Sequence, residues 1–590
     1  MGCKWAATAV VTIGWALAAA HPGGAAPASP HAELDARIRE VAALPGEPHV
    51  FESAGVTRQD LPMRSIESLE PVDSSRRRLV IIGGLDGDDR SVSAVLGALR
   101  WFKTAAPAAV RSQWSVTALP CGNPEGWAQF KPTNNSFGKP AVNYPPEGGF
   151  FDDRRNVEAR YIWRWIAFQA PDLVLDVQGG NSMRWMTPPA SAALGASVRA
   201  QPLISADTLE MALSRGTPSG LGTVPSLLVY ARDTDGPELL RLALGAAEAA
   251  PARSPLRRAL LARTARSPLE VASLLAARYP QSPSIDYISA VAWNGALRLA
   301  RLRNDPALRE KVRQALQPYL SGARPTLDGN VDTVRLAGHS VFAELAGAEG
   351  DPAGAEAAKR LTLEAAVRFK PEKADDPARL GRFWTDDMFM VSVLLAPAGR
   401  LSADGGHHDL AARTLSLYAS RLQRPDGLFN HALDAPHAWG RGNGFAALSL
   451  AEVLGALPEA HAGRPALLEA YRKQMAALKP WQAPEGTWRQ VVDHPESYRE
   501  VTATAMLLAA MARGIRQGWL DKSYLPMARR AWSGLSARIE NDGGLVDVSD
   551  GTAAGPSLRY YYERPALSGM NERGGAMALL AALEMAELPK

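Results

Sequence analysis

The chain has few of the residues that build the simplest functional sites. Only two of its 590 residues are cysteines, Cys3 and Cys121. Because Cys3 falls in a predicted export signal, the mature chain would keep one thiol, which excludes an internal disulfide, and no C-x-x-C pair is present for zinc. The net charge is only +4. This balance gives no reason to expect a basic surface, so nucleic acid is not an expected partner.

A long uncharged apolar run occurs only at the N-terminus. Residues 1–4 carry a positive charge, residues 5–20 are uncharged, and Ala26-Pro27-Ala28 fits a small-residue cleavage site, with residues 18–20 as the alternative. This order is typical of a secretory signal. An uncleaved membrane anchor is the competing interpretation, but the run is short and rich in alanine. We therefore expect residues 1–28 to be a signal peptide and the mature protein to be exported, periplasmic or secreted, without stable membrane insertion.

The first half of the chain alternates apolar runs with helix-like stretches. The predicted strands cover residues 79–82, 173–177 and 226–230, and the predicted helices between them cover residues 91–104 and 157–170. Short runs rich in β-branched residues, two of which stop at glycine, are typical of buried parallel strands. We therefore predict an α/β domain over residues 29–245. Residues 246–267 are rich in Ala, Pro and Arg, and we expect them to be a linker.

Helical patterns repeat from residue 268 to the end. The predicted helices cover residues 268–279, 285–303, 307–321, 331–348, 351–369, 384–396, 406–423, 440–457, 463–479, 499–516, 522–540 and 568–587. Residues 501–512 are apolar nearly all round, as in a helix buried on both sides, whereas the next helix has one apolar face. Alternating inner and outer helices predict an all-α (α/α)6 barrel of six hairpins over residues 268–590. An open solenoid remains the alternative, because periodicity does not show closure.

Polar, aromatic and glycine-rich segments stand at the start of several even-numbered helices. The candidate site residues among them are Trp384, Asp386, His431, Asp434, Trp439, Arg441, Asn443, Trp488, Arg489, Tyr498, Arg499, Glu500 and Thr502. In a closed barrel these helix ends meet at one mouth, where such residues would form a ligand site. Each also has a simpler interpretation. Asp386 and Asp387 are good helix caps, and Asp434 alone would be an ordinary surface residue.

Four of these segments resemble a known family. W-T-D-D-M-F-M at 384–390, G-L-F-N-H-A-L-D at 427–434, W-G-R-G-N-G at 439–444 and S-Y-R-E-V-T-A-T-A-M at 497–506 are similar to motifs of the family 88/105 glycoside hydrolases. These are the unsaturated uronyl hydrolases, including the unsaturated rhamnogalacturonyl hydrolases, and their fold is an (α/α)6 barrel. The resemblance implies that Asp434 is the general acid/base and Asp386 the second essential carboxylate. It also places Trp439, Arg441 and Asn443 around the substrate, with Arg441 near the uronate carboxylate.

The resemblance implies an unusual glycoside hydrolysis without metal or cofactor. Polysaccharide lyases leave a terminal uronic acid with a double bond between its fourth and fifth ring carbons. In this family an acid protonates the fourth carbon, water adds at the fifth, and the hemiketal opens to release the neighbouring sugar. Asp434 would have to be protonated when substrate binds, and partial burial beside Asp386 or the uronate would favour that form. Unsaturated oligosaccharides from pectic rhamnogalacturonan are the expected substrates.

This sequence also departs from the family pattern. Asn430, Leu433 and Phe445 stand where the family usually has aromatic residues, two of them tryptophan. These changes alter surfaces on which sugars stack, and so they affect the expected aglycone more than the acid. A catalytically inactive oligosaccharide-binding or scaffold protein is the competing hypothesis. The sequence leaves the linkage and the oligomeric state open.

The front domain resembles the zinc carboxypeptidases in three short segments. They are I-G-G-L-D-G-D-D at 82–89, N-P-E-G at 123–126 and D-V-Q-G-G at 176–180. Asp86 and Gln178 stand where that family has histidine ligands, and Asp89 stands where it has glutamate. Because zinc prefers imidazole to such a set, we expect the usual metal site to be absent, with Asp86, Asp89 and Gln178 as weak candidates for an oxygen-ligand site. An active metallocarboxypeptidase is the alternative, and the role of this domain stays open.

Overall fold

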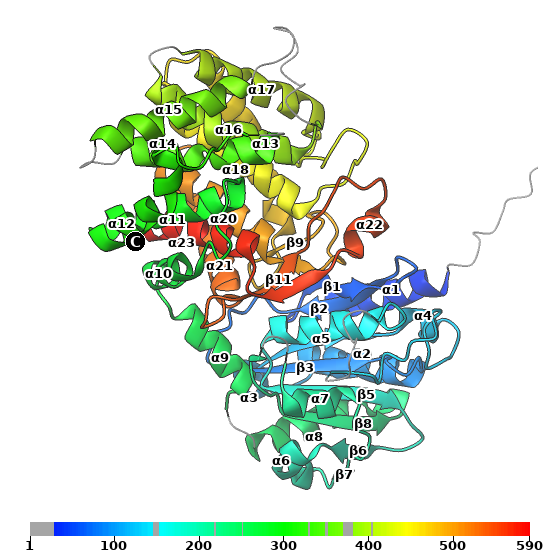
Figure 1. The fold of residues 1–590 in the computed structure, drawn as a ribbon. Coiled ribbons are helices and arrows are strands. Elements are labelled where there is room, and N and C mark those ends of the chain that lie inside the picture. The colour runs from blue at the N-terminus through cyan, green and yellow to red at the C-terminus, as the bar shows by residue number, and fades with distance from the viewer. Residues whose placement is uncertain are drawn as a thin grey trace, which may run out of the picture.

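The computed structural model describes residues 29–145, 153–217, 220–249, 252–328, 331–347, 352–369, 382–402 and 405–589. The predicted signal at residues 1–28 lies outside these ranges. Within them, no helix combines the length and apolar character needed to cross a membrane. The described chain forms a front domain built around a sheet and a larger helical domain that packs against it (Figure 1).

An eight-stranded mixed sheet forms the middle of the front domain, in the order β1-β2-β4-β3-β5-β8-β6-β7. The strands are β1 (Val50–Val56), β2 (Pro62–Glu67), β3 (Arg77–Gly83), β4 (Trp114–Leu119), β5 (Leu173–Gly179), β6 (Arg184–Thr187), β7 (Gln201–Pro202) and β8 (Ser226–Ala231). The three predicted strands are β3, β5 and β8, and they run parallel in the interior of the sheet. This confirms the predicted parallel core. The sequence pattern does not predict the other strands, among them the antiparallel pair β1–β2 at one edge.

Helices cover both faces of this sheet. They are α1 (Pro30–Ala42), α2 (Asp89–Thr104), α3 (Ala108–Gln113), α4 (Pro124–Trp127), α5 (Val157–Gln169), α6 (Ala192–Ser197), α7 (Leu209–Arg215) and α8 (Gly236–Ala246). The two predicted helices correspond to α2 and α5. Apolar side chains of α1, α2 and α8 pack on one face of the sheet. Those of α5 and α7 belong to a second cluster that continues into the core of the helical domain, so the two domains share one apolar interface.

Of the predicted linker at residues 246–267, the described residues 252–267 pack against both domains. It contains helix α9 (Pro255–Thr264), which runs along the side of both domains (Figure 1). Arg257 of this helix is fully buried and pairs with Asp172 of the front domain at 2.5 Å. Arg266, just after the helix, donates to the carbonyl of Ser536 in the helical domain at 2.9 Å. The connection is therefore held at both ends, which a composition rich in Ala, Pro and Arg does not reveal.

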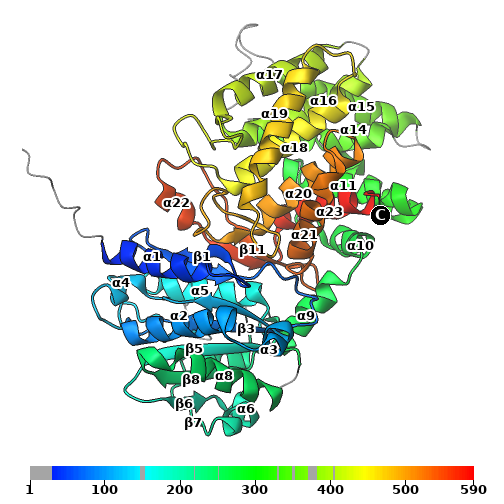
Figure 2. The same ribbon diagram turned by 180° about the vertical axis from the view of Figure 1, so that it is seen from behind.

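The helical domain is a closed barrel of paired helices (Figures 1 and 2). The inner helices are α11 (Tyr287–Arg303), α13 (Thr333–Gly338) with α14 (Ser340–Ala346), α16 (Thr385–Leu401), α18 (Gly440–Ala456), α20 (Val501–Arg516) and α23 (Glu572–Ala586). The outer helices are α10 (Pro268–Arg278), α12 (Pro306–Leu320), α15 (Pro352–Arg368), α17 (Gly406–Leu422), α19 (Arg464–Ala477) and α21 (Leu525–Ser536). Each inner helix packs against the next, and α23 packs back on α11. This closure confirms the barrel and excludes the open solenoid.

Two details of the barrel differ from the sequence pattern. The helix predicted over residues 331–348 is broken at His339 into α13 and α14. Four short strands and one extra helix also lie between the barrel and the front domain: β9 (Trp488–Arg489), β10 (Arg499–Glu500), β11 (Leu545–Ser549), β12 (Ala566–Gly569) and α22 (Leu558–Tyr562). The four strands form two small antiparallel pairs. They lie beside the N-terminal ends of the inner helices, and we call this end of the barrel the mouth. The domain predicted to be all-α therefore also has short strands at its mouth.

Candidate active site

The two adjacent carboxylates at the start of α16 have different roles. Asp387 is buried and accepts hydrogen bonds from the backbone N–H groups of Arg382 at 2.6 Å and Trp384 at 3.0 Å. Burial raises the pKa of Asp387. Asp386 makes no such cap, and 25% of its side chain stays exposed. The capping interpretation therefore holds for Asp387, whereas Asp386 is left to face the mouth.

A chain of hydrogen bonds runs from the backbone to Asp386. The Gly555 N–H donates to the Tyr561 hydroxyl at 3.1 Å, which lies 2.8 Å from His431 Nδ1. His431 Nε2 lies 3.2 Å from Asp386 Oδ2. Because the Asp386 carboxylate can only accept, the neutral imidazole is assigned its proton on Nε2, and Nδ1 then accepts from the Tyr561 hydroxyl. His431 then donates to Asp386 and fixes the orientation of that carboxylate.

Asp434 lies on the exposed loop between α17 and α18. Burial, reinforced by the charges of Tyr560, Asp386 and Asp434, raises the pKa of Tyr561. The structure therefore brings both predicted catalytic carboxylates into the electrostatic range of one phenol. The partial burial expected for Asp434 is not found, because its side chain is exposed. Any exclusion of water around it has to come from bound sugar.

The indole of Trp439 packs against the ring of His431. It is fully buried, and its ring lies 4.3 Å from the His431 ring, centroid to centroid. The Asn443 amide donates to the carbonyls of Phe429 at 2.9 Å and Trp439 at 3.0 Å, so it holds the loop that carries His431. Trp439 and Asn443 thus shape the site without facing it. Trp384 is the partly exposed predicted aromatic residue at the mouth.

Arg441 does not hold a free guanidinium toward the mouth, as the family resemblance implied. Only 2% of the residue is exposed, and it donates to the carbonyls of Ser549 at 2.6 Å and Asp550 at 2.8 Å. Burial lowers its pKa, and the positive charge of Arg573 lowers it further. The physical reason for the correction is that the two Nη atoms, which would form a pair of hydrogen bonds with a carboxylate, already donate to these two backbone carbonyls at the end of β11.

Arg573 is a partly exposed arginine within electrostatic range of Asp386. It lies in the first turn of α23, and its Nε donates to the hydroxyl of Tyr287 at 2.9 Å. The charges of Tyr287, Asp386 and Glu500 raise its pKa despite burial. The N-E-R-G-G segment at the start of the last helix could have pointed to it, since the same polar and glycine-rich pattern marks the other inner helices. No sequence signal points to Tyr287 or Tyr561.

Arg489 and Arg499 bind the front domain instead of a ligand. Arg489 Nη2 lies 2.5 Å from Glu52 Oε2 on β1, and Arg499 Nη2 lies 3.1 Å from Glu67 Oε2 on β2. Arg499 Nε also pairs with Glu485 at 2.6 Å. Both arginines are almost fully buried, so the expectation that they contact substrate is corrected: the front domain supplies one counter-ion to each.

The other predicted residues of this segment also have structural partners. Glu500 accepts from the backbone N–H groups of Thr502 at 2.9 Å, Ala503 at 2.5 Å and Ser549 at 2.9 Å, so it caps α20 and ties it to β11. Trp488 donates to the Leu478 carbonyl at 3.1 Å. Thr502 is fully buried. These residues form the wall behind the mouth and not its surface, and Tyr498 faces a different cavity between the domains.

The front-domain candidates do not form a metal site. Asp86 accepts from the Gly179 N–H at 2.6 Å, and Gln178 donates to Asp176 at 3.0 Å. The carboxylate of Asp89 accepts from Arg37 at 2.7 Å and Trp127 at 2.9 Å, partners that are no metal ligands. Across the described ranges no three His, Cys, Asp or Glu side chains gather as a metal ion would need. These residues therefore do not fit zinc, and the carboxypeptidase resemblance stays a prediction.

A closed barrel with two carboxylates, a histidine and aromatic side chains at its mouth has the form of a glycoside hydrolase site. The model of Glycosyl Hydrolase Family 88 matches residues 269–588, more than half of the chain, and the chain belongs to this family. It is 27% identical over 212 residues to the unsaturated rhamnogalacturonyl hydrolase YesR of Bacillus subtilis, which covers 35% of this chain and 57% of that protein.

Other relatives match shorter or more distant stretches. An unsaturated 3S-rhamnoglycuronyl hydrolase of Alteromonas is 26% identical over 173 residues, 27% of this chain and 42% of that protein. The chain thus matches about half the length of these two curated relatives. A family 105 glycoside hydrolase structure from C. acetobutylicum is 20% identical, with a TM-score of 0.49, and covers 55% of this chain and 100% of that one.

Proposed function

We propose that this protein hydrates the double bond of a terminal 4,5-unsaturated uronic acid and so releases that sugar from oligosaccharides made by polysaccharide lyases. The observation that carries the proposal is the Gly555–Tyr561–His431–Asp386 chain of hydrogen bonds at the mouth of a family 88 barrel, with Asp434 within the electrostatic range of the same tyrosine. Unsaturated fragments of pectic rhamnogalacturonan are the proposed substrates, in line with the name of the Bacillus subtilis relative.

In this mechanism Asp434 is the general acid/base. Its protonated form delivers a proton to the fourth ring carbon, and water adds at the fifth carbon, where positive charge develops. The resulting hemiketal opens and expels the neighbouring sugar. Asp386, which His431 orients, stabilises the positive charge that develops on the ring or positions the attacking water. Because the exposed Asp434 has to be protonated at the moment of binding, the bound uronate itself would supply the negative charge that favours its acid form.

Arg573 is the proposed partner of the sugar carboxylate. It carries a guanidinium in the range of Asp386, it is partly exposed, and Tyr287 fixes its Nε. Its remaining donors could meet the uronate in a bidentate pair. Arg441, whose two Nη atoms donate to backbone carbonyls, supports the wall next to it.

The decisive experiment follows the ultraviolet absorbance of the alkene in lyase-generated oligosaccharides. The wild-type protein should remove the absorbance, and Asp434→Asn should slow its loss by at least about a hundredfold. Asp409→Asn is the matched control, since Asp409 is an exposed aspartate on the outer helix α17 and should leave the rate unchanged. If Asp434→Asn is as fast as the control, Asp434 is not the acid. If no oligosaccharide in a panel of lyase products is turned over, the protein is a binding or scaffold protein instead.

An exported location is part of the proposal. It rests on the three-part pattern of residues 1–28, which places the enzyme where lyase products of large polysaccharides are formed. N-terminal sequencing of the mature protein, expected to begin near residue 29, tests it.

A further inference from the structure

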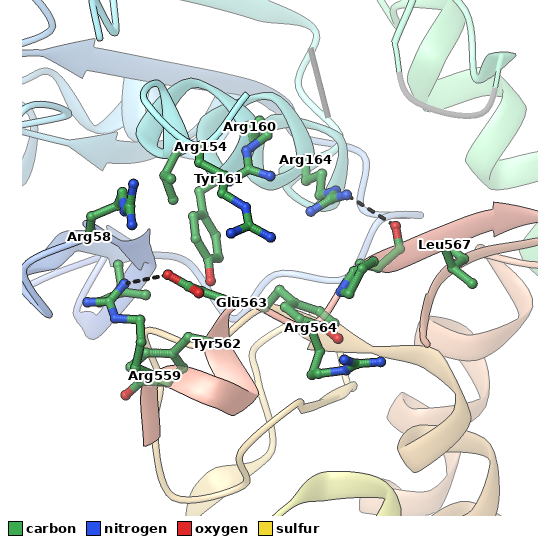
Figure 3. A pocket seen from close by; sticks show the side chains of 15 residues that line it. Arg58, Arg154, Arg160, Tyr161, Arg164, Arg559, Tyr562, Glu563, Arg564 and Leu567 are labelled. Carbon is green, nitrogen blue, oxygen red and sulfur yellow. Dashed lines mark hydrogen bonds and ion pairs between the residues drawn. The ribbon is translucent and has the colours of Figure 1, made fainter. Parts of the chain in front are cut away.

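A cavity of about 280 Å³ lies between the front domain and the barrel, apart from the Asp386 group. Figure 3 shows its lining: β1 and α5 contribute from the front domain, and α22 with the loop after it contributes from the barrel. Ligand pockets begin at roughly 300 Å³. The volume of this cavity is close to that lower limit, so the cavity can hold one sugar ring but not a long chain.

Positive charge dominates this cavity. Its lining contains six arginines, Arg58, Arg154, Arg160, Arg164, Arg559 and Arg564, and a single carboxylate, Glu563. Three of them have acidic partners within 4 Å: Arg164 with Asp547, Arg559 with Asp60 and Glu563, and Arg564 with Asp550. In the part of the chain that the structure describes, Arg58 and Arg154 have no ion pair, and both are exposed. The cavity thus keeps positive charge that an anion would balance.

A buried donor without an acceptor lies in the same wall. Tyr161 of α5 is only 8% exposed, and its hydroxyl has no hydrogen-bond partner within the described residues. Burial raises the pKa of Tyr161 to about 12, so the hydroxyl keeps its proton at neutral pH. Figure 3 shows this hydroxyl pointing from α5 toward α22, across the cavity. A buried donor of this kind costs stability unless something accepts from it.

The cavity lies behind the candidate active site. Tyr561 and Tyr562 are neighbours at the end of α22, but the first binds His431 and the second lines the cavity. Tyr498, which also lines it, lies in the segment just before α20 and is within electrostatic range of Arg441 and Glu500. A ligand in the cavity would therefore touch the helix and the segment that hold the active-site wall.

We propose that this interdomain cavity binds a second carboxylate-bearing sugar, a uronate. Planar guanidinium groups match a carboxylate with two parallel hydrogen bonds, and the rings of Tyr161, Tyr498 and Tyr562 offer surfaces for a sugar. The identity of the ligand as a uronate rests on the proposed function, because the acidic oligosaccharides of that reaction are the anions at hand. The uronate is either a further acidic residue of the substrate or a separate molecule.

The first experiment measures binding by calorimetry and not turnover. Asp434→Asn is the background, so that the active site cannot consume a ligand. Monomeric galacturonate should bind, and neutral galactose should bind at least tenfold more weakly. Adding Arg58→Gln and Arg154→Gln should weaken galacturonate binding at least tenfold, whereas the matched pair Arg258→Gln and Arg529→Gln, exposed arginines that do not line the cavity, should not. Equal binding in both double variants would overturn the proposal.

Tyr161→Phe separates a ligand site from a structural role. It removes only the hydroxyl, which has no hydrogen-bond partner among the described residues, so the stability of the free protein should stay unchanged or rise. Galacturonate binding should nevertheless weaken about tenfold. Unchanged binding in this variant would mean that the Tyr161 hydroxyl does not contact the ligand. Inorganic sulfate binding as tightly as galacturonate would mean a general anion site. Either result would overturn the assignment to a uronate.

Turnover then identifies the source of the sugar. If the uronate belongs to the substrate, Arg58→Gln with Arg154→Gln should raise KM at least tenfold for an unsaturated oligosaccharide with a second acidic residue and leave one without it unaffected. If the uronate is a separate molecule, KM should be unchanged for both, while added galacturonate should alter the wild-type rate and not that of the double variant. Loss of the proposed function would appear as no turnover at all, with the binding result intact.

Discussion

His431 Nε2 lies 3.2 Å from the Oδ2 atom of Asp386, and the other ring nitrogen faces the hydroxyl of Tyr561 at 2.8 Å. The imidazole is fully buried, whereas Asp386 is partly exposed. One side of the carboxylate is therefore fixed by the protein, and the other is open to a ligand. This arrangement makes His431 a positioning residue that acts through Asp386.

The hydroxyl of Tyr561 should matter for the rate because it selects the His431 tautomer. Tyr561→Phe removes the donor to Nδ1, so the imidazole proton can move to that nitrogen and leave Asp386 without its hydrogen bond. We expect kcat to fall about tenfold or more, with KM nearly unchanged, in the alkene assay. Tyr560→Phe, the neighbouring exchange on α22, serves as control. A rise in KM with constant kcat would show that Tyr561 binds sugar instead.

We predict that Arg441 has a structural role and that Arg573 binds the substrate. Arg441→Lys loses one of two charged hydrogen bonds to the carbonyls of Ser549 and Asp550, and we expect the free energy of unfolding to fall by about 2 kcal/mol. Arg573→Lys should leave stability within about 1 kcal/mol but raise KM about tenfold, since an ammonium cannot pair with a carboxylate through two parallel bonds. Urea unfolding and the alkene assay measure both.

The reverse pattern would contradict the assignment. If Arg441→Lys raises KM at constant stability and Arg573→Lys changes only stability, then Arg441 contacts the uronate, as the family motif alone implied. The ligand-bound protein would then have to release the Ser549 and Asp550 carbonyls from that guanidinium.

The barrel could be predicted because its signal is local. An inner helix such as α20 is apolar all round and its outer neighbour is not, and this contrast repeats along the chain. Asp386 and Asp434 could be singled out through the family motifs, since without them Asp386 would be an ordinary helix cap and Asp434 an ordinary surface residue. The roles of the arginines could not be predicted from the sequence. The partners of Arg441 are backbone carbonyls, which any residue supplies and which leave no pattern in the sequence.

The interface between the domains could not be predicted from the sequence for a different reason. Arg489 pairs with a residue 437 positions away and Arg499 with one 432 positions away. Their partners Glu52 and Glu67 lie on the edge strand β1 and on β2 beside it, and neither strand has an apolar run that would have predicted it. An arginine flanked by polar and aromatic residues looks the same in a sequence whether it meets a sugar or another domain. Only the three-dimensional arrangement decides between them.

The buried pair of Arg499 and Glu67 should contribute strongly to stability. Glu67 is fully buried and also accepts from Trp165 at 2.7 Å and Gln169 at 2.9 Å. Glu67→Gln leaves Arg499 with only Glu485 as counter-ion, and we expect the free energy of unfolding to fall by about 3 kcal/mol. Glu40→Gln breaks an exposed pair with Arg100 and should cost less than about 1 kcal/mol. Equal losses in urea unfolding would show that the interface ion pair adds nothing.

Glu158 of α5 should make the front domain less stable as pH rises. It is fully buried, and burial raises its pKa from 4.5 to about 7. Between these two values the folded chain holds a proton that the unfolded chain releases, so the free energy of unfolding falls with increasing pH, by up to about 3 kcal/mol in total. The loss begins above the pKa of the unfolded chain and is complete above that of the folded chain.

Glu158→Gln removes this titration, and the variant should show a flatter dependence of urea unfolding on pH between 4.5 and 8. Asn134 Nδ2, which donates to the Glu158 carboxyl at 2.7 Å, can keep its bond to the amide oxygen of glutamine. Glu469→Gln, an exposed glutamate on α19, should keep the wild-type slope. Because the apolar cluster around α5 continues into the barrel, the change should appear in the unfolding of both domains. A wild-type slope in Glu158→Gln would mean that other buried carboxyls, Asp176 and Glu210 among them, set the pH dependence.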